Sequence, residues 1–332
     1  MRRYFCICMI ALLILTGCSK KQAIEPITQV QLTQLPVNLA TLSHDAALTL
    51  LLIDDHLLQV WDNQSQQLMK QIEGSKYQLT FRDALIAPSK RSIVSISDTQ
   101  LNIWQLHTNE IVSYSLPEFD SSIRITKAQW SSDEQLIALG YNDGSVLLLS
   151  LDKQTITKIH LHESSVTHLI FNRSLTSLYS ASLDGHAKRL ELQSKEITID
   201  YALPHRITSL ALSQNENRLF VSDALQAQEL IDTRSGEPVL SLSYPQRFKF
   251  FRGAQFLASD EFLLTTSSKA YISLWELVSG TEIISWPIAQ RSAGSTVYDF
   301  HLSDSNVLTT ISSDGMLEKW AVTPILFAPK RQ

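Results

Sequence analysis

Three histidines lie close together in the sequence and have the side chains of a metal site. His160 and His162 are separated by one residue, so on a strand both side chains would point to one face, and His168 follows nearby. A zinc site also needs acidic or thiol ligands at fixed spacing, and the adjacent candidate, Glu163, would point to the opposite face. We therefore expect no metal site: His162 should be a structural residue of the fold, and His160 should lie on a strand surface.

Nucleophilic catalysis and phosphate binding have less support in the sequence. Serines are abundant, but they fall in turns and strands, and no Gly-x-Ser-x-Gly elbow occurs. The chain has only 10 glycines and no glycine-rich phosphate loop. Its formal net charge is −5, so no basic excess suggests a nucleic-acid partner. We expect no catalytic residues, no cofactor and no nucleic-acid binding.

The N-terminus carries the most specific local signal of the chain. Arg2 and Arg3 precede the apolar stretch Tyr4–Leu15, which is too short to span a bilayer comfortably. This stretch runs into Leu-Thr-Gly-Cys, ending at Cys18, which resembles the lipobox of bacterial lipoproteins. The resemblance implies that the thiol of Cys18 accepts diacylglycerol and that residues 1–17 are then removed as a signal peptide. The alternative is an ordinary secretory signal in which the cysteine is incidental.

Cysteine usage and the residue after the lipobox favour a periplasmic location. Cys6 and Cys8 lie in the segment to be removed, so the mature body would contain no free thiol, as suits an oxidising compartment. Ser19 stands where lipoproteins retained in the inner membrane commonly carry Asp, which by resemblance favours the outer membrane. Residues 18–26 are predicted to be the lipidated cysteine and a polar tether.

Similar apolar strands end at seven positions, spaced by about 40 to 45 residues, a period typical of propeller blades. These positions are Trp61, Trp104, Leu149, Leu190, Leu230, Trp275 and Trp320. Three polar breaks in each unit, several of them Asp-Gly turns, separate four short runs rich in Val, Ile, Leu, Thr and Tyr. We predict an all-β fold: a seven-bladed β-propeller of four-stranded antiparallel blades.

Some units also carry motif residues of a known family. The fullest unit runs from His162 to Asp184-Gly185, and Trp61-Asp62 supplies a Trp-Asp pair. At these residues the chain resembles the WD-repeat β-propellers, over residues 27–323, with residues 324–332 as a C-terminal tail. In that family Asp, His, Ser and Trp form a hydrogen-bonded tetrad within a blade. No unit here carries all four, so blade stability should rest more on packing.

The resemblance also predicts how the ring closes. Ile27–Leu35 alternates as a strand, whereas Pro324 and Pro329 interrupt the sequence after the last marker. In WD-repeat propellers the N-terminal strand completes the last blade. Residues 27–35 should therefore pair beside the strand ending at Trp320, which would remove free sheet edges.

Candidate partner-binding residues lie in the connections between units. These connections are shorter between units three and four and between units four and five than elsewhere, which predicts binding loops on one side of the ring. Residues 244–252 combine four aromatics with three cations, a composition suited to an interface. The candidates are Arg247, Phe248, Lys249, Phe250 and Arg252, with Trp286 and Arg291 in a second, weaker segment. Alternatively, alternate aromatics begin the next strand and the cations face solvent.

Together these observations predict a non-catalytic envelope lipoprotein. It would act as a protein-binding scaffold or accessory subunit, docking other envelope proteins on its loops and reaching the membrane through its lipid. The alternative is a periplasmic enzyme or small-ligand sensor that uses the central channel. Charged side chains at the channel mouth would favour that alternative, whereas an aromatic-rich loop face with an empty channel would favour docking.

Overall fold

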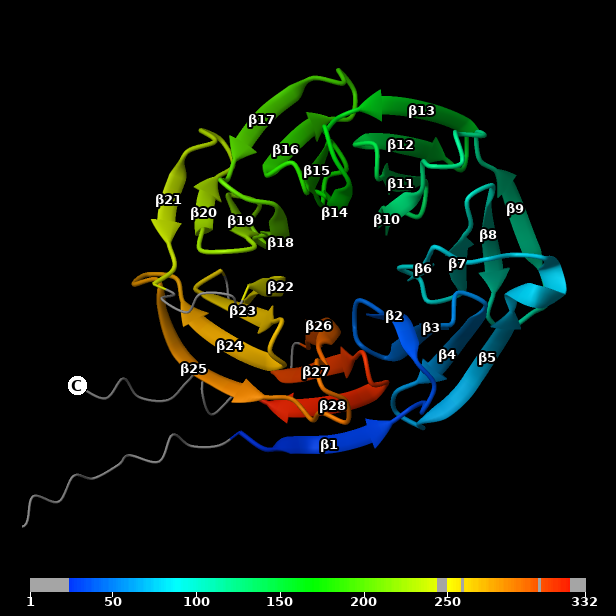
Figure 1. The fold of residues 1–332 in the computed structure, drawn as a ribbon, viewed down its shortest axis with the longest axis horizontal. Coiled ribbons are helices and arrows are strands. Elements are labelled where there is room, and N and C mark those ends of the chain that lie inside the picture. The colour runs from blue at the N-terminus through cyan, green and yellow to red at the C-terminus, as the bar shows by residue number, and fades with distance from the viewer. Residues whose placement is uncertain (1–23, 244–249, 258–259, 304–305, 323–332) are drawn as a thin grey trace, which may run out of the picture.

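Seven four-stranded antiparallel sheets surround a common axis in the computed structural model (Figure 1). The structure describes residues 24–243, 250–257, 260–303 and 306–322. Each sheet is one blade, and its first strand, here called the inner strand, lies nearest the axis (Figure 1). This arrangement confirms the predicted seven-bladed propeller.

The blades follow one another in chain order. Blades one to three comprise β2 (Val37–Leu42), β3 (Leu48–Ile53), β4 (Leu57–Asp62) and β5 (Gln67–Glu73); β6 (Asp83–Ile86), β7 (Ser92–Ile96), β8 (Gln100–Gln105) and β9 (Ile111–Ser115); and β10 (Ile125–Trp130), β11 (Leu136–Tyr141), β12 (Ser145–Ser150) and β13 (Thr155–His160). Blades four and five comprise β14 (Val166–Phe171), β15 (Ser177–Ser182), β16 (His186–Glu191) and β17 (Ile197–Ala202); and β18 (Ile207–Leu212), β19 (Arg218–Asp223), β20 (Gln228–Asp232) and β21 (Pro238–Ser241). Blades six and seven comprise β22 (Phe251–Leu257), β23 (Phe262–Ser267), β24 (Tyr271–Glu276) and β25 (Thr281–Pro287); and β26 (Val297–Leu302), β27 (Val307–Ser312), β28 (Met316–Ala321) and β1 (Pro26–Gln31). The 3-10 helix η1 (Gly74–Tyr77) follows β5, and within the described residues no helix is long and apolar enough to cross a membrane.

The first strand of the chain closes the ring, as predicted. β1 pairs antiparallel with β28, from Pro26 opposite Trp320 to Gln31 opposite Met316. The strand is shorter than the predicted residues 27–35, because the chain beyond Gln31 turns toward β2. Since β28 is covered on both sides, blade seven has no unpaired third strand that could recruit another chain.

Packing between blades accounts for the core of the ring. Buried hydrophobic residues form seven clusters, and each cluster joins two neighbouring blades. Between blades six and seven, for example, the rings of Trp286 and Trp320 lie 6.2 Å apart. Because each sheet buries its apolar face on a neighbour, no blade could cover its own core in isolation.

The WD-repeat tetrad is present only in parts, in agreement with the prediction from the sequence. In blade four, the ring of His162 lies between Asp184, at 3.1 Å from Nδ1, and Ser180, at 2.8 Å from Nε2, but Leu190 occupies the tryptophan position. Blade two instead has the tryptophan part of the tetrad, because Nε1 of Trp104 donates to the Ser95 hydroxyl at 2.7 Å. Packing around Leu190, which is fully buried, replaces the missing bond.

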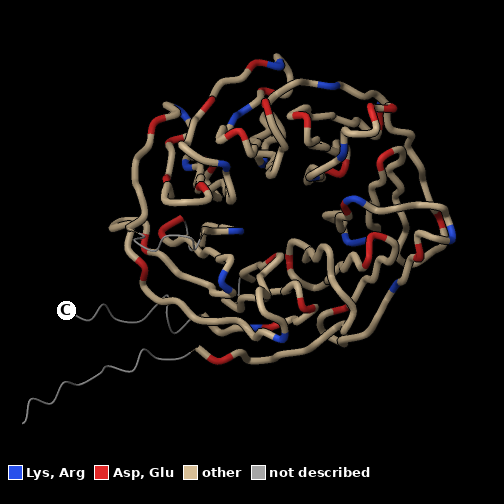
Figure 2. The backbone as a smooth tube through the Cα atoms, in the orientation of Figure 1, with Lys and Arg blue, Asp and Glu red and all other residues tan. Residues whose placement is uncertain are grey.

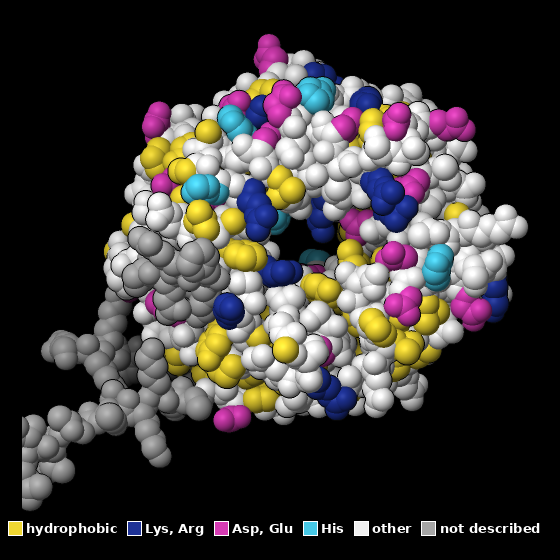
Figure 3. Space-filling view, in the orientation of Figure 1, with side chains coloured by type: hydrophobic (Ala, Val, Ile, Leu, Met, Phe, Trp, Pro, Cys, Tyr) yellow, Lys and Arg dark blue, Asp and Glu magenta, His cyan; other side chains and the backbone are white. Residues whose placement is uncertain are grey.

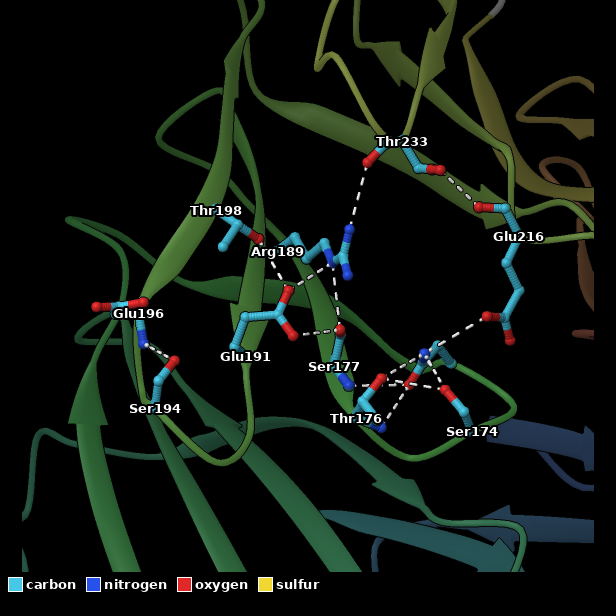
Figure 4. A network of polar contacts seen from close by, with 11 residues as sticks. Ser174, Thr176, Ser177, Arg189, Glu191, Ser194, Glu196, Thr198, Glu216 and Thr233 are labelled. Atoms are coloured by element: carbon cyan, nitrogen blue, oxygen red, sulfur yellow. Dashed lines mark hydrogen bonds and ion pairs between the residues drawn. The ribbon is translucent and has the colours of Figure 1, made fainter.

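Turns between the first and second strands link neighbouring blades in a way that the sequence analysis did not predict. Each turn has one non-glycine residue in the left-handed region at the same position: Ala46, Lys90, Glu134, Leu175, Glu216, Asp260 and Asn306. Several of these side chains reach back to the preceding blade. Glu216 accepts from the backbone N–H of Arg173, and Asp260 accepts from the N–H groups of Gln214 and Asn215. Figure 4 shows the polar network that joins blades four and five through Glu216, Thr233 and Arg189.

The two faces of the ring differ. We call the face with the turns between first and second strands the basal face, and the face with the connections between blades the loop face. The longer connections are 74–82, 116–124, 242–250 and 288–296, and the shorter ones are 32–36, 161–165 and 203–206. The longer connections therefore form two pairs on either side of the closing blade, with the short connection 32–36 between them.

Candidate functional site

Phe250 and Arg252, two of the predicted partner-binding residues, lie on the loop face where the connection 242–250 enters the inner strand β22. Arg252 is exposed, and its guanidinium lies 5.8 Å from the centre of the half-buried Phe250 ring. Phe251 is only 1% exposed and packs in the core between blades five and six. At this strand start the Phe251 side chain points inward and Arg252 outward; the other two cations of the segment lie outside the described residues, so the alternative interpretation stays a prediction.

Three other candidates in this segment, Arg247, Phe248 and Lys249, lie outside the described residues, as does the predicted acylation site Cys18. The second segment is divided between core and surface. Trp286 is only 2% exposed and packs on Trp320, so a partner could not contact it without opening the interface between blades. Arg291 is exposed in the connection 288–296, where its backbone N–H donates to Asp314 at 2.8 Å.

Arginines occupy the loop-face ends of four inner strands. Arg82 and Arg124 lie immediately before β6 and β10, Arg206 immediately before β18, and Arg252 at the second residue of β22. The guanidinium of Arg82 forms a bidentate bond with Asp98, at 3.0 and 2.7 Å. Figure 3 shows Lys and Arg side chains around the opening at the centre of the ring. We call the loop-face end of the channel, with these four arginines, the basic mouth.

A cavity of about 540 Å³ runs along the channel beside blades one, two, three and seven. Two carboxylates, Asp83 and Asp299, occupy the same position in the inner strands of blades two and seven and line this cavity. Lys127 holds that position in blade three, and its ammonium has no carboxylate within 4.0 Å among the described residues. The channel is therefore charged but not ion-paired at this level.

The two channel aspartates hold neighbouring blades together. Asp83 accepts from the N–H of Ala128 in blade three at 2.8 Å, and Asp299 accepts from the N–H of Leu42 and the hydroxyl of Thr41 in blade one. Each also accepts from the N–H of its own next residue. Burial raises the pKa of both carboxyl groups, and the hydrogen bonds and Lys127 oppose that shift. With their oxygens occupied by backbone donors, these groups are poorly placed as catalytic bases.

The histidines are structural or peripheral. Because the Asp184 carboxylate only accepts, Nδ1 of His162 carries the hydrogen and Nε2 accepts from Ser180. Burial lowers the pKa of His162, although Asp184 favours its charged form. Burial also lowers the pKa of His168, to about 3, so its ring is neutral at pH 7. His160 is exposed at the end of β13, as predicted, and no three His, Cys, Asp or Glu side chains among the described residues are placed to hold a metal ion.

Trp130 lies where the core between blades two and three meets the channel cavity. Trp130, at the end of the inner strand β10, lines the cavity and is 5% exposed. Its indole Nε1 has no hydrogen-bond partner within the described structure. No pattern in the sequence marked Asp83, Asp299 or Trp130 as channel residues, because the aligned inner-strand positions hold unrelated side chains in other blades.

Comparison with known proteins supports the repeat assignment. A family model described as the anaphase-promoting complex subunit 4 WD40 domain matches residues 90–174 and 128–215. Autophagy-related protein 16 of Arabidopsis thaliana is 21% identical over 230 residues, covering 68% of this chain and 44% of that protein. COMPASS component SWD3 of Saccharomyces cerevisiae is 22% identical over 173 residues, covering 50% and 55%, respectively. DNA damage-binding protein 2 of Mus musculus is 25% identical over 182 residues, covering 53% and 40%.

The chain thus spans 40% to 55% of the length of these three relatives. The matched family model and the closed ring of seven four-stranded blades together support a WD-repeat propeller.

Proposed function

We propose that this WD-repeat-type propeller is a non-catalytic scaffold or accessory subunit that holds a partner protein on its loop face. The observation that carries the proposal is the basic mouth, where exposed arginines surround the channel and the longer connections flank it. The names of the similar proteins add support: the family model is named for a subunit and one relative for a component of a larger assembly. A rigid ring whose inner strands are linked by Asp83 and Asp299 suits docking, because its binding surface is already ordered.

We further propose that Cys18 is acylated and anchors the protein to the cell envelope, on the periplasmic side of the outer membrane. The support is the lipobox-like sequence and Ser19. β1 begins at Pro26 opposite Trp320, toward the basal face, so a tether would leave the ring on the side away from the basic mouth. Fully extended, residues 19–25 would reach about 25 Å at roughly 3.5 Å per residue. An anchored ring would then present its loop face to the periplasm.

Affinity capture from detergent-solubilised membranes tests the docking proposal. The full chain should capture a partner that is lost when Phe250→Ala and Arg252→Ala are combined, since both residues stand at the basic mouth. A matched control combines Val239→Ala and Val278→Ala, which remove exposed apolar side chains far from that mouth and should leave capture unchanged. Equal capture by all three proteins, with unchanged melting temperatures, would remove the loop face from consideration.

The anchor is tested separately with Cys18→Ser. Metabolic labelling with a clickable fatty acid should label the wild type and not the variant, and the variant should move from the membrane to the soluble fraction. Retention of an unlabelled variant in the membrane would contradict the proposed anchor.

A small-ligand sensor is the second candidate, because charged groups do lie in the channel. Its support is the 540 Å³ cavity and the ammonium of Lys127, which has no carboxylate within 4.0 Å among the described residues. A small anionic ligand bound there should raise the melting temperature of the wild type but not of Lys127→Met. A screen of small carboxylates and phosphates that leaves the wild-type melting temperature unchanged would count against this candidate.

A further inference from the structure

On the loop face, arginines lie near the axis of the ring and aspartates lie farther from it. The inner-strand ends carry Arg82, Arg124, Arg206 and Arg252. The turns between second and third strands, farther from the axis, carry aspartates in several blades: Asp55, Asp98, Asp143, Asp184 and Asp314. Figure 2 shows acidic and basic positions distributed over the whole ring.

Three of the four mouth arginines have no acidic partner in the part of the chain that the structure describes. Arg124, Arg206 and Arg252 are exposed, and none forms an ion pair with a carboxylate among the described residues. Two of the outer aspartates accept hydrogen bonds from neutral groups, Asp184 from His162 and Asp314 from Ser292 and Ser295, which hold the carboxylates in place without removing their charge. The loop face therefore has negative charge on its outer turns and unpaired positive charge at the inner-strand ends around the opening.

The lumen below the mouth limits how far an anion would enter. Asp83 and Asp299 lie at the same inner-strand level as Lys127, so the negative charges of the carboxylates and the positive charge of the ammonium largely offset one another there. Tyr298 directly precedes Asp299 in the inner strand of blade seven, and its hydroxyl donates to the carbonyl of Val37 at 3.1 Å. An anionic group is thus favoured at the mouth and not deep in the channel.

We propose that the segment docked at the basic mouth is an acidic, extended stretch of a partner protein, with its carboxylates over Arg124, Arg206 and Arg252. This inference rests on the proposed docking function and names the chemistry of its partner. An acidic peptide fits better than a nucleic acid, because a phosphate backbone crossing the loop face would also meet the outer aspartates and a chain of net charge −5. A single extended peptide end contacts only the basic centre.

Fluorescence anisotropy with the full chain in detergent tests the inference. The probe is a fluorescein-labelled decapeptide of alternating Glu and Ser, compared with the same peptide carrying Gln in place of Glu. The glutamate peptide should bind the wild type and the glutamine peptide should not. Raising NaCl from about 0.05 M to about 0.5 M should weaken binding strongly, since exposed charges are screened.

The decisive variant combines Arg124→Glu, Arg206→Glu and Arg252→Glu. It should weaken glutamate-peptide binding at least about tenfold, as expected for three exposed charge pairs. The matched control combines Lys153→Glu, Lys195→Glu and Arg234→Glu, which make the same charge change in exposed turns between third and fourth strands and should leave affinity unchanged. If the triple reversal lowers the melting temperature, the milder set Arg124→Gln, Arg206→Gln and Arg252→Gln replaces it.

Equal affinity of the mouth variant and the control variant would overturn the inference, as would tighter binding of a fluorescein-labelled oligothymidine than of the glutamate peptide. The capture experiment separates this failure from failure of the proposed function. If a partner is captured equally by the wild type and the mouth variant, the ring still holds a partner, but not through an acidic segment at the basic mouth. If no partner is captured, docking fails, while the peptide titration still decides the charge preference of the mouth.

Discussion

Replacing Asp184 with alanine should destabilise the ring far more than the same change at the corresponding turn of the preceding blade. Asp184 accepts from Nδ1 of His162 at 3.1 Å and from the N–H groups of Glu163 and His186 at 2.9 and 2.8 Å. The His162 side chain is fully buried, so Asp184→Ala leaves its N–H without a partner, at a cost of about 2 kcal/mol. Water reaches the two turn N–H groups, which adds about 1 kcal/mol. We expect a total loss of about 3 kcal/mol.

Asp143→Ala is the matched control, because Asp143 holds the same turn in blade three but bonds no histidine. It accepts from the N–H and hydroxyl of Ser145, and its loss should cost about 1 kcal/mol. Urea unfolding at pH 7 measures both free energies. In a His162→Leu background, the cost of Asp184→Ala should fall to that of the control, since no buried donor remains. Equal costs for Asp184→Ala and Asp143→Ala in the wild-type background would refute the argument.

Three further predictions concern the closing blade and the core. Burial raises the pKa of Glu318 to about 7, above its ordinary value of 4.5. Between these two pH values the folded state binds more protons than the unfolded state, so the free energy of unfolding should fall as pH rises through this window. Glu318→Gln should remove most of this pH dependence from urea-unfolding free energies measured from pH 5 to 8. Deleting residues 1–31 removes β1 and exposes the edge of β28, so light scattering should detect self-association that the intact chain lacks. Leu190→Trp supplies the missing tetrad residue, but the fully buried site is filled, so unfolding should become easier by about 1–3 kcal/mol, and a gain in stability would contradict the packing account.

The ring and its blade count followed from the sequence because turns and strand alternation are local features repeated seven times, whereas the closure was predicted from the resemblance to WD-repeat propellers. Asp-Gly at 184–185 and 314–315 needs only its own hairpin to be recognised, and the strand at residues 27–35 alternates on its own. The marker residues fell on the third strand of every blade for the same reason. Because the same turns recur in every repeat, a turn assigned wrongly in one unit does not change the predicted number of blades.

The channel could not be predicted in this way, because its residues act between blades. Asp83 bonds Ala128 in the next blade, and the same inner-strand position holds Leu39, Lys127 and Ser209 elsewhere, so no periodic pattern marks it. Trp286 was misjudged for a related reason. Its Trp-Pro sequence suggests a surface connection, but blade seven covers it through Trp320. Contacts between units depend on which side chains face each other across the interface, and one unit alone does not specify them.

The proposed anchor and the proposed docking surface lie on opposite faces of the ring, so the two proposals can be tested independently. The side chains that link blades across the turns, such as Glu216 and Asp260, lie on the basal face, and β1 starts on that side. The unpaired arginines lie at the opposite end of the inner strands. Charge reversal at the basic mouth therefore removes no interblade hydrogen bond observed among the described residues, and the proposed acylation site precedes a strand that starts on the basal side. Loss of partner binding with unchanged membrane association, and the reverse for Cys18→Ser, is the pattern that this geometry requires.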